Sequence, residues 1–395
     1  MKNGIKELLG LQHLWIDGWE IKGNELIVPV RVPRKYCMCP HCTSSTKKVH
    51  SYKIRRIKHS VWQEKTVILL YKQRRFYCRK CNKAFTEYSK GIDRKNTTEN
   101  FRSILLKNMA RASLKYTMDN SNVSSSTLYG VLNENHLRQE INWEEQGEKF
   151  SLGIDEHSFR GTRMALTLTN ITKRKLLKVC EDDKIETVER FLASTDKQRI
   201  NEVCIDMKRG FLLAAQRQLP DAIITVDKFH VIAYANKMVD EVRKVIIGKD
   251  FKARRALFKG KERLREKEKL KLEFIFDKYK NYPALYEAYF VKEKLREFYR
   301  SENMQEAKKN MKNLIMFCEN SSSKYITDFG GTLKRWKEHI LNHFVNGSTS
   351  AFTEGVHTKI KMIKRMSFGF RNIQNYIAKI SLAFLPFLLI NHHTF

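Results

Sequence analysis

The chain has 395 residues, which is enough for two or three domains with at least one sizeable core. Its 75 Lys and Arg residues against 43 Asp and Glu residues give a formal net charge of +32 at pH 7. This excess goes beyond what solubility requires and predicts a polyanionic partner, with nucleic acid as the first expectation and a merely basic, ribosomal-type protein as the alternative.

The cysteines and the apolar segments indicate the cellular compartment of the protein. Five of the eight cysteines lie in the first quarter of the chain, unlike the even spacing of a secreted disulfide framework. The first residues lack the apolar region of a signal peptide. The longest apolar stretch, Ile380 to Ile390, contains Pro386, is too short to span a bilayer and is interpreted as a buried helix. We therefore expect a cytoplasmic, nucleoid-associated protein with no membrane partner.

Residues 1–95 are predicted to form a zinc-binding β domain. Strands are expected at residues 26–32 and 67–71, and two Cys-x-x-Cys turns supply Cys39, Cys42, Cys78 and Cys81. Four thiolates can surround one zinc ion and leave no position for water, so the zinc would be structural. Cys37 and His41 lie beside the first turn and are interpreted as bystanders. The alternative is four buried free cysteines, which two such turns among Lys and Arg residues disfavour.

Two segments of the N-terminal part are candidates for DNA contact. Arg74 and Arg75 give the second predicted strand a basic surface suited to the DNA backbone, although a solvated strand face would look the same. Residues 96–148 are expected to form a helix-turn-helix domain, with its second helix starting at a Ser-rich segment. That geometry would place Ser125, Ser126 and Thr127 near bases or phosphates, and an ordinary helix pair is the alternative.

From residue 150 the pattern changes to three strands, a helix and two further strands. Strands are predicted at residues 150–155, 164–169, 176–180 and 202–206, with a helix at residues 185–194 between the third and fourth. This order is expected of an RNase H-like core, in which the first and fourth strands are neighbours. The predicted fold class is therefore α/β. Its catalytic domain comprises residues 149–231 and 346–395, and a helical insertion of residues 232–345 interrupts it.

Acidic residues follow several of these strands. Asp155 ends the first predicted strand and Asp206 the fourth, so both carboxylates should meet at one edge of the sheet. Asp227 ends a fifth strand, with His230 three residues later. Strand order favours Asp206 over Asp227 as the second catalytic carboxylate, and Asp227 and His230 remain secondary candidates. For any one Asp, a solvated strand end is the simpler interpretation.

The third carboxylate is expected on a late basic helix. Glu354 lies in the predicted helix 350–365, off its apolar stripe and on a face with His357, Thr358, Lys361 and Arg365. Lys364 is a further basic residue of this helix. A surface salt-bridge face is the alternative. Two aspartates and a glutamate can hold two magnesium or manganese ions, which suit phosphodiester chemistry. The basic residues of this helix would then contact DNA. Trp336 of the insertion is interpreted as a core residue in preference to one that stacks on a base.

Five motifs in this order resemble the ISL3 family of bacterial insertion-sequence transposases. They are the two cysteine turns, Gly153 to Arg160, Ile205 to Met207, Val226 to Val231, and Thr353 to Arg365 followed by Phe368 to Asn372. The resemblance implies a zinc-binding domain, a helix-turn-helix and a DDE catalytic domain with a helical insertion. The family's carboxylates would fall at Asp155, at Asp206 or Asp227, and at Glu354. Similar proteins usually have Asn where this chain has His357, which changes the contacts expected of that helix.

The resemblance also implies a substrate and an assembly. The N-terminal domains would bind the terminal inverted repeats of double-stranded DNA, and the catalytic domain would cleave the ends and join them to a target. A homodimer in the DNA complex is expected because transposition uses paired ends. Two alternatives stay open: a zinc and helix-turn-helix regulator without catalysis, and an RNase H-fold DNA nuclease.

Overall fold

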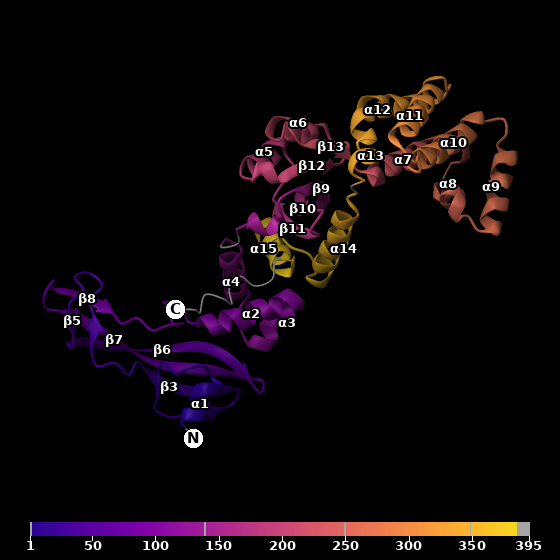
Figure 1. The fold of residues 1–395 in the computed structure, drawn as a ribbon. Helices are drawn as coiled ribbons and strands as arrows, with labels where there is room; N and C mark the ends of the chain where they lie inside the picture. The colour runs from indigo at the N-terminus through magenta and orange to yellow at the C-terminus, as the bar shows by residue number, and fades with distance from the viewer. Residues whose placement is uncertain (1, 138–139, 249, 348, 385–395) are drawn as a thin grey trace. The chain divides into compact units, whose positions relative to one another are not determined.

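The computed structural model describes residues 2–137, 140–248, 250–347 and 349–384 (Figure 1). The chain divides into two compact units, one formed by Met1–Gln139 with Met362–Phe395 and the other by Glu140–Lys361. In the described ranges, none of the helices has the length and apolar composition needed to cross a membrane.

The first unit is built on a six-stranded sheet. β7 (Lys65–Cys78) lies at its centre, parallel to β3 (Glu25–Arg31) and antiparallel to β6 (Val49–Trp62). The two strands predicted from sequence are confirmed as β3 and part of β7. The remaining short elements of this region are α1 (Lys2–Leu8), β1 (Trp15–Ile16), β2 (Glu20–Lys22), β4 (Cys37–Met38), β5 (Ser45–Thr46) and β8 (Lys83–Thr86).

The hairpin that joins β6 to β7 was not predicted. Gln63 and Glu64 form its two-residue turn, and both have positive φ, +46° and +64°. Two residues with positive φ match the right-handed twist of the paired strands, and the usual sequence for such a turn is Asn-Gly or Asp-Gly. Gln-Glu gives no such signal, so β6 could not be recognised from its turn.

Four helices complete the first unit: α2 (Glu99–Arg111), α3 (Leu114–Ser121), α4 (Ser125–Leu137) and α15 (Ile373–Phe384). Thr98 and Ser113 cap α2 and α3, since each hydroxyl accepts a hydrogen bond from a backbone N–H of the first turn. The Lys379 side chain is buried and donates to the carbonyls of Met109 and Ala112 at the end of α2. The C-terminal segment is thus a structural part of this unit.

The second unit contains a five-stranded sheet in the order β11-β10-β9-β12-β13. Its strands are β9 (Phe150–Arg160), β10 (Arg163–Asn170), β11 (Lys175–Cys180), β12 (Ile200–Ile205) and β13 (Ile223–Val226). β9, β12 and β13 are parallel, whereas β10 and β11 form an antiparallel extension on the other side of β9. The predicted contact between the first and fourth strands is confirmed.

One detail of the sequence prediction was wrong. Asp155 does not end a strand, because β9 continues to Arg160 and pairs with β10 through a tight hairpin. The apolar run stops at Asp155 because the parallel partner β12 stops there, with Ile205 opposite Ile154 as the last pair. Beyond that point β9 is covered by β10 alone and needs fewer apolar side chains.

Helices pack on this sheet and continue the chain beyond it. α6 (Arg209–Gln218) packs on β12 and β13 and against α5 (Ile185–Ala193), and the long α7 (Lys228–Ile247) begins directly after β13. The apolar core runs without a break from the sheet into the insertion. The remaining helices are α8 (Phe251–Phe258), α9 (Glu266–Lys278), α10 (Pro283–Phe298), α11 (Met304–Glu319), α12 (Lys324–Leu341) and α13 (His343–Asn346).

The late basic helix is present as α14 (Ala351–Met366), which crosses the boundary between the two units. The apolar stretch interpreted as a buried C-terminal helix is described only in part. Its residues 380–384 are helical and belong to α15, and residues 385–390 lie outside the described residues. The predicted domain boundaries at residues 95, 148, 231 and 345 stay predictions.

Candidate catalytic centre and zinc site

Three aspartates occupy equivalent positions on neighbouring parallel strands. Ile154, Ile205 and Val226 lie side by side in the sheet, and the residue after each of them is Asp155, Asp206 or Asp227. The backbone N–H of Asp227 continues this ladder by donating to the Ile205 carbonyl, at 2.9 Å. The in-register pairing of these parallel strands therefore brings all three carboxylates to the same level of the sheet, where β12 and β13 end and β9 continues.

His230 lies among these carboxylates. Its Nε2 is 3.6 Å from Oδ2 of Asp155 and 3.9 Å from Oδ2 of Asp227, and its Nδ1 is 3.3 Å from Oδ1 of Asp206. The side chain comes from the first turn of α7, immediately after β13. From the sequence, His230 is only a secondary candidate, because the start of a helix after a strand does not show that the ring points back towards the carboxylates.

The electrostatics follow from this arrangement. Burial lowers the pKa of His230, but the contact with Asp155 and the charges of Asp206 and Asp227 outweigh it and raise that pKa to about 9. Burial alone would raise the pKa of Asp155, yet the neighbouring histidines bring it below its usual value. The pKa of Asp206 is raised, chiefly by burial. His230 is thus the cation that balances a cluster of carboxylates at neutral pH.

Asp206 and Asp227 differ in exposure. The Asp206 side chain is 27% exposed, whereas that of Asp227 is 2% exposed and its Oδ1 accepts a hydrogen bond from the Ser350 backbone N–H. The other oxygen of Asp227 is buried without a hydrogen bond among the described residues. An oxygen-rich donor set with an unsatisfied carboxylate oxygen fits a hard divalent cation such as magnesium.

A second histidine reaches Asp155 from α14. His357 Nδ1 lies 3.6 Å from Asp155 Oδ2, and its Nε2 lies 3.0 Å from the hydroxyl of Thr167 on β10. The same hydroxyl lies 2.8 Å from Nδ1 of His157 on β9. Burial lowers the pKa of His357, so its ring is neutral at pH 7. Thr167 and His157 were missed from the sequence, since alternate residues of a strand show which face is buried but not what it contacts.

A glycine lets α14 approach the sheet. The hydroxyls of Thr169 on β10 and Thr353 on α14 are buried and 2.7 Å apart. A Cβ added to Gly153 on β9 would lie 2.4 Å from the first hydroxyl and 2.9 Å from the second. Only glycine leaves room for this close helix and sheet contact.

Glu354 follows Thr353 on α14 and is exposed. It lies three residues before His357, so the two side chains are neighbours on the helix surface. Among the described residues, the four cysteines described below are the one group of three or more potential ligand atoms that all lie within 4.8 Å of one another, so neither Glu354 nor the three aspartates form such a group. The structure thus gathers Asp155, Asp206 and Asp227 around His230 and places Glu354 on the adjacent helix without a direct contact to them.

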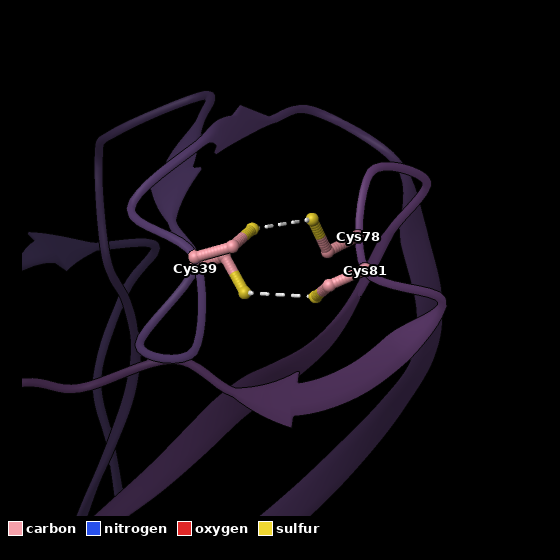
Figure 2. Close-up of side chains that lie close together, drawn as sticks. Cys39, Cys78 and Cys81 are labelled. Atoms are coloured by element: carbon pink, nitrogen blue, oxygen red, sulfur yellow. Dashed lines mark hydrogen bonds between the residues drawn. The ribbon is translucent and has the colours of Figure 1, made fainter.

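The four cysteines of the two turns form a compact cluster in the first unit. Their sulfur atoms all lie within 4.8 Å of one another, with Cys39 and Cys81 at 3.7 Å and Cys42 and Cys78 at 3.5 Å (Figure 2). A tetrahedral zinc site with Zn–S bonds of about 2.3 Å requires sulfur atoms about 3.8 Å apart. The geometry thus supports structural zinc. Cys37 is outside the cluster, and its thiol contacts the Met38 carbonyl at 3.8 Å.

The basic residues proposed for DNA contact have different surroundings. Arg74 is largely buried and donates from Nε and Nη2 to the buried carboxylate of Glu87, at 2.9 and 2.7 Å, whereas Arg75 is exposed. At the start of α4, Ser125 and Ser126 are exposed and Thr127 is half-buried, with its backbone N–H capped by Ser124. On α14, Lys361 and Arg365 are exposed and Lys364 is half-buried. Contact of these residues with DNA stays a prediction.

Two family models match the parts of the chain that contain the three aspartates and the four cysteines. Residues 152–380 match the family model of ISL3 transposases, and residues 35–81 match the zinc-finger of transposase IS204/IS1001/IS1096/IS1165. The transposase for insertion sequence element IS1001 of Bordetella parapertussis is 24% identical over 388 residues, covering 92% of this chain and 93% of that protein. The transposase for IS1557 of Mycobacterium tuberculosis is 26% identical over 262 residues, covering 58% of each. The ISL3 family model covers more than half of the sequence, and the chain belongs to the ISL3 family of insertion-sequence transposases.

Proposed function

We propose that the protein binds the terminal inverted repeats of its insertion sequence, cleaves the DNA at these ends and transfers the strands to a target. The observation that carries the proposal is the register of Asp155, Asp206 and Asp227 at one sheet edge, beside a helix that bears Glu354. The strand order, with three parallel strands and an antiparallel extension, is that expected of an RNase H-like core. Helices α2 to α4 supply the proposed helix-turn-helix.

Asp155, Asp206 and Glu354 are the proposed ligands for two magnesium ions. Asp206 is favoured over Asp227 because its carboxylate is more exposed and one oxygen of Asp227 is bound to the Ser350 backbone. Asp227 is the secondary candidate, since its other oxygen has no hydrogen bond among the described residues. Two bound magnesium ions would supply an activated water or 3′ hydroxyl and a counter-charge for the leaving 3′ oxygen. His357 and Thr167 hold the Asp155 carboxylate in place. His230 supplies positive charge between the carboxylates and keeps them together before DNA and metal arrive.

The proposal is tested by incubating the purified protein with magnesium and DNA that carries the element ends and their flanks. Cleavage followed by joined products is the expected result. Cleavage without joining would favour an RNase H-fold nuclease, and specific binding without cleavage would favour a regulator. Sedimentation of the DNA complex tests the homodimer in the same preparation.

Substitution of the carboxylates tests the assignment of ligands. Asp155→Asn, Asp206→Asn and Glu354→Gln should each reduce cleavage about 10³-fold, because loss of a ligand removes several kcal/mol of transition-state stabilisation. DNA binding should remain. Asp221→Asn provides the control, since Asp221 is an exposed carboxylate of the same unit outside the cluster. Equal activity of Glu354→Gln and the control would remove Glu354 from the site.

A change of metal preference separates a ligand from a residue that only supports the fold. Asp155→Cys should be inactive with magnesium and partly active with manganese, because a thiolate binds the softer ion better. A structural defect would affect both metals equally.

A further inference from the structure

A cavity of about 420 Å³ opens beside the proposed catalytic carboxylates. Its lining includes Asp206 and His230 of the carboxylate cluster together with Tyr234, Lys237, Arg335 and Trp336. Tyr234 and Lys237 come from α7, and Arg335 and Trp336 come from α12. The helical segment after β13 therefore forms most of the wall. The volume lies in the range of sites that bind small molecules.

The aromatic part of the wall offers a stacking surface. Tyr234 is 39% exposed, and Phe329 stacks behind it with ring centroids 6.0 Å apart and an interplanar angle of 25°. Trp336 is 8% exposed, which confirms its place in the core, yet part of it still lines the cavity. The exposed tyrosine ring is therefore held on a rigid support, which is what base stacking requires.

The charged part of the wall suits a phosphate. Lys237 is exposed, and its Nζ lies over the Tyr234 ring at 5.9 Å from the centroid, so this long side chain has to move aside for a base to stack on that face. Arg335 is exposed, and its Nη2 donates to the Thr332 hydroxyl at 2.9 Å. The wall of the cavity thus combines two cations with the Asp206 carboxylate, one of the ligands proposed beside the scissile phosphate. A nucleotide carries a flat base and a negatively charged phosphate, so it can contact both the aromatic and the cationic side chains of this wall.

We propose that this cavity holds one unpaired nucleotide next to the scissile phosphate, with its base against Tyr234 and its phosphate near Lys237 and Arg335. The proposal rests on the function proposed above and adds a substrate subsite formed by the insertion. A base inside a duplex is covered on both faces by its neighbours, so only a base that has left the stack can contact the ring. Duplex ends and strands opened near a cleavage site supply such bases.

The experiment is a double-mutant cycle between protein and DNA. Binding of end-bearing DNA is measured in magnesium-free buffer for wild type and for Tyr234→Ala, with a single abasic site placed in turn at each nucleotide near the cleavage site. At one position we expect the abasic site to weaken wild-type binding roughly tenfold, and to have little further effect on Tyr234→Ala. Independent effects of the two changes at every position would overturn the proposal.

Control variants separate stacking from folding. Tyr234→Phe keeps the ring and should bind like wild type, whereas loss of binding in this variant would also count against stacking. Tyr325 is 40% exposed on α12 and does not line the cavity, so Tyr325→Ala should leave the cycle unchanged. Lys237→Gln and Arg335→Gln should each lower the salt dependence of binding by about one counterion.

The double-mutant cycle measures the affinity for DNA and does not depend on cleavage. If the protein cleaves and joins DNA but the two changes act independently, the subsite proposal fails alone. If cleavage is absent while the cycle shows coupling, the proposed catalysis fails and the nucleotide site stands.

Discussion

At the scale of single residues, the centre depends on histidines that hold carboxylates. Three aspartates at one sheet edge repel one another, and His230 lies within 4 Å of each of them. His357 adds a second contact to Asp155 from a different element. In the metal-free site, the positive charge of protonated His230 therefore offsets the negative charge of the aspartates. His357 is neutral and contributes through its hydrogen bond with Thr167.

The charge on His230 makes the stability of the metal-free protein depend on pH. The folded-state pKa of about 9 lies above the unfolded value of 6.5, so the contribution is complete below pH 6.5 and is lost as the pH rises through 9. We expect the free energy of unfolding to fall by about 1–2 kcal/mol over this range, after allowing for solvent screening of a partly exposed ring. Urea denaturation in magnesium-free buffer measures it.

His230→Asn is the matched variant for that measurement. It should lose stability at pH 6 and show a flatter pH profile than wild type. If the free energies of unfolding of the two proteins changed with pH in the same way, a group other than His230 would be responsible for the pH dependence.

Thr167 is expected to position His357 without touching the substrate. Thr167→Val removes the hydroxyl shared by His157 and His357 while keeping the shape, and should reduce cleavage about tenfold, the lower end of the effect of losing a partner of a metal ligand, because Thr167 reaches Asp155 only through His357. Thr167→Ser keeps the hydroxyl and should restore most of the rate. Cleavage rates at saturating DNA, measured as a function of magnesium concentration, test whether Thr167 positions His357. Equal rates in both variants would contradict this role.

At the scale of elements, one contact fixes α14 on the sheet. Gly153→Ala would push its Cβ against Thr169 and Thr353, so we expect a loss of about 1–3 kcal/mol in the free energy of unfolding. Cleavage should fall as well, because Glu354 and His357 move with the helix. Urea denaturation and cleavage assays measure the two effects.

Gly355→Ala is the control on the same helix. A Cβ at this position meets no atom within 4 Å, and alanine favours a helix over glycine by roughly 0.5–1 kcal/mol. A stability change of the same sign in both variants would contradict the packing argument.

At the scale of the whole molecule, charge governs association with DNA. The net charge of +32 predicts many phosphate contacts and hence a strong dependence of binding on salt. We expect affinity for end-bearing DNA to fall at least about 10³-fold between 50 and 200 mM salt, as it does for roughly six or more phosphate contacts. Fluorescence anisotropy titrations measure the slope, and a weak salt dependence would mean that most of the basic residues face away from DNA.

The sequence by itself determined the succession of strands along the second unit, the contact between its first and fourth strands, the two cysteine turns and the position of Asp206 directly after a strand. Local patterns predict those features: runs of β-branched residues, the fixed spacing of the cysteines, and an acidic residue at the end of an apolar run. It could not show that β9 continues past Asp155, because the partner strand β10 decides where β9 ends.

Only the tertiary structure decided which side chains meet. The place of His230 among three carboxylates, the hydroxyl of Thr167 between two histidines and the cavity between α7 and α12 all join residues from separate elements. Such contacts depend on the direction in which each side chain leaves the backbone and on close packing between helix and sheet. A single sequence records the periodicity of each element, but the distances between elements are set by how their surfaces fit together.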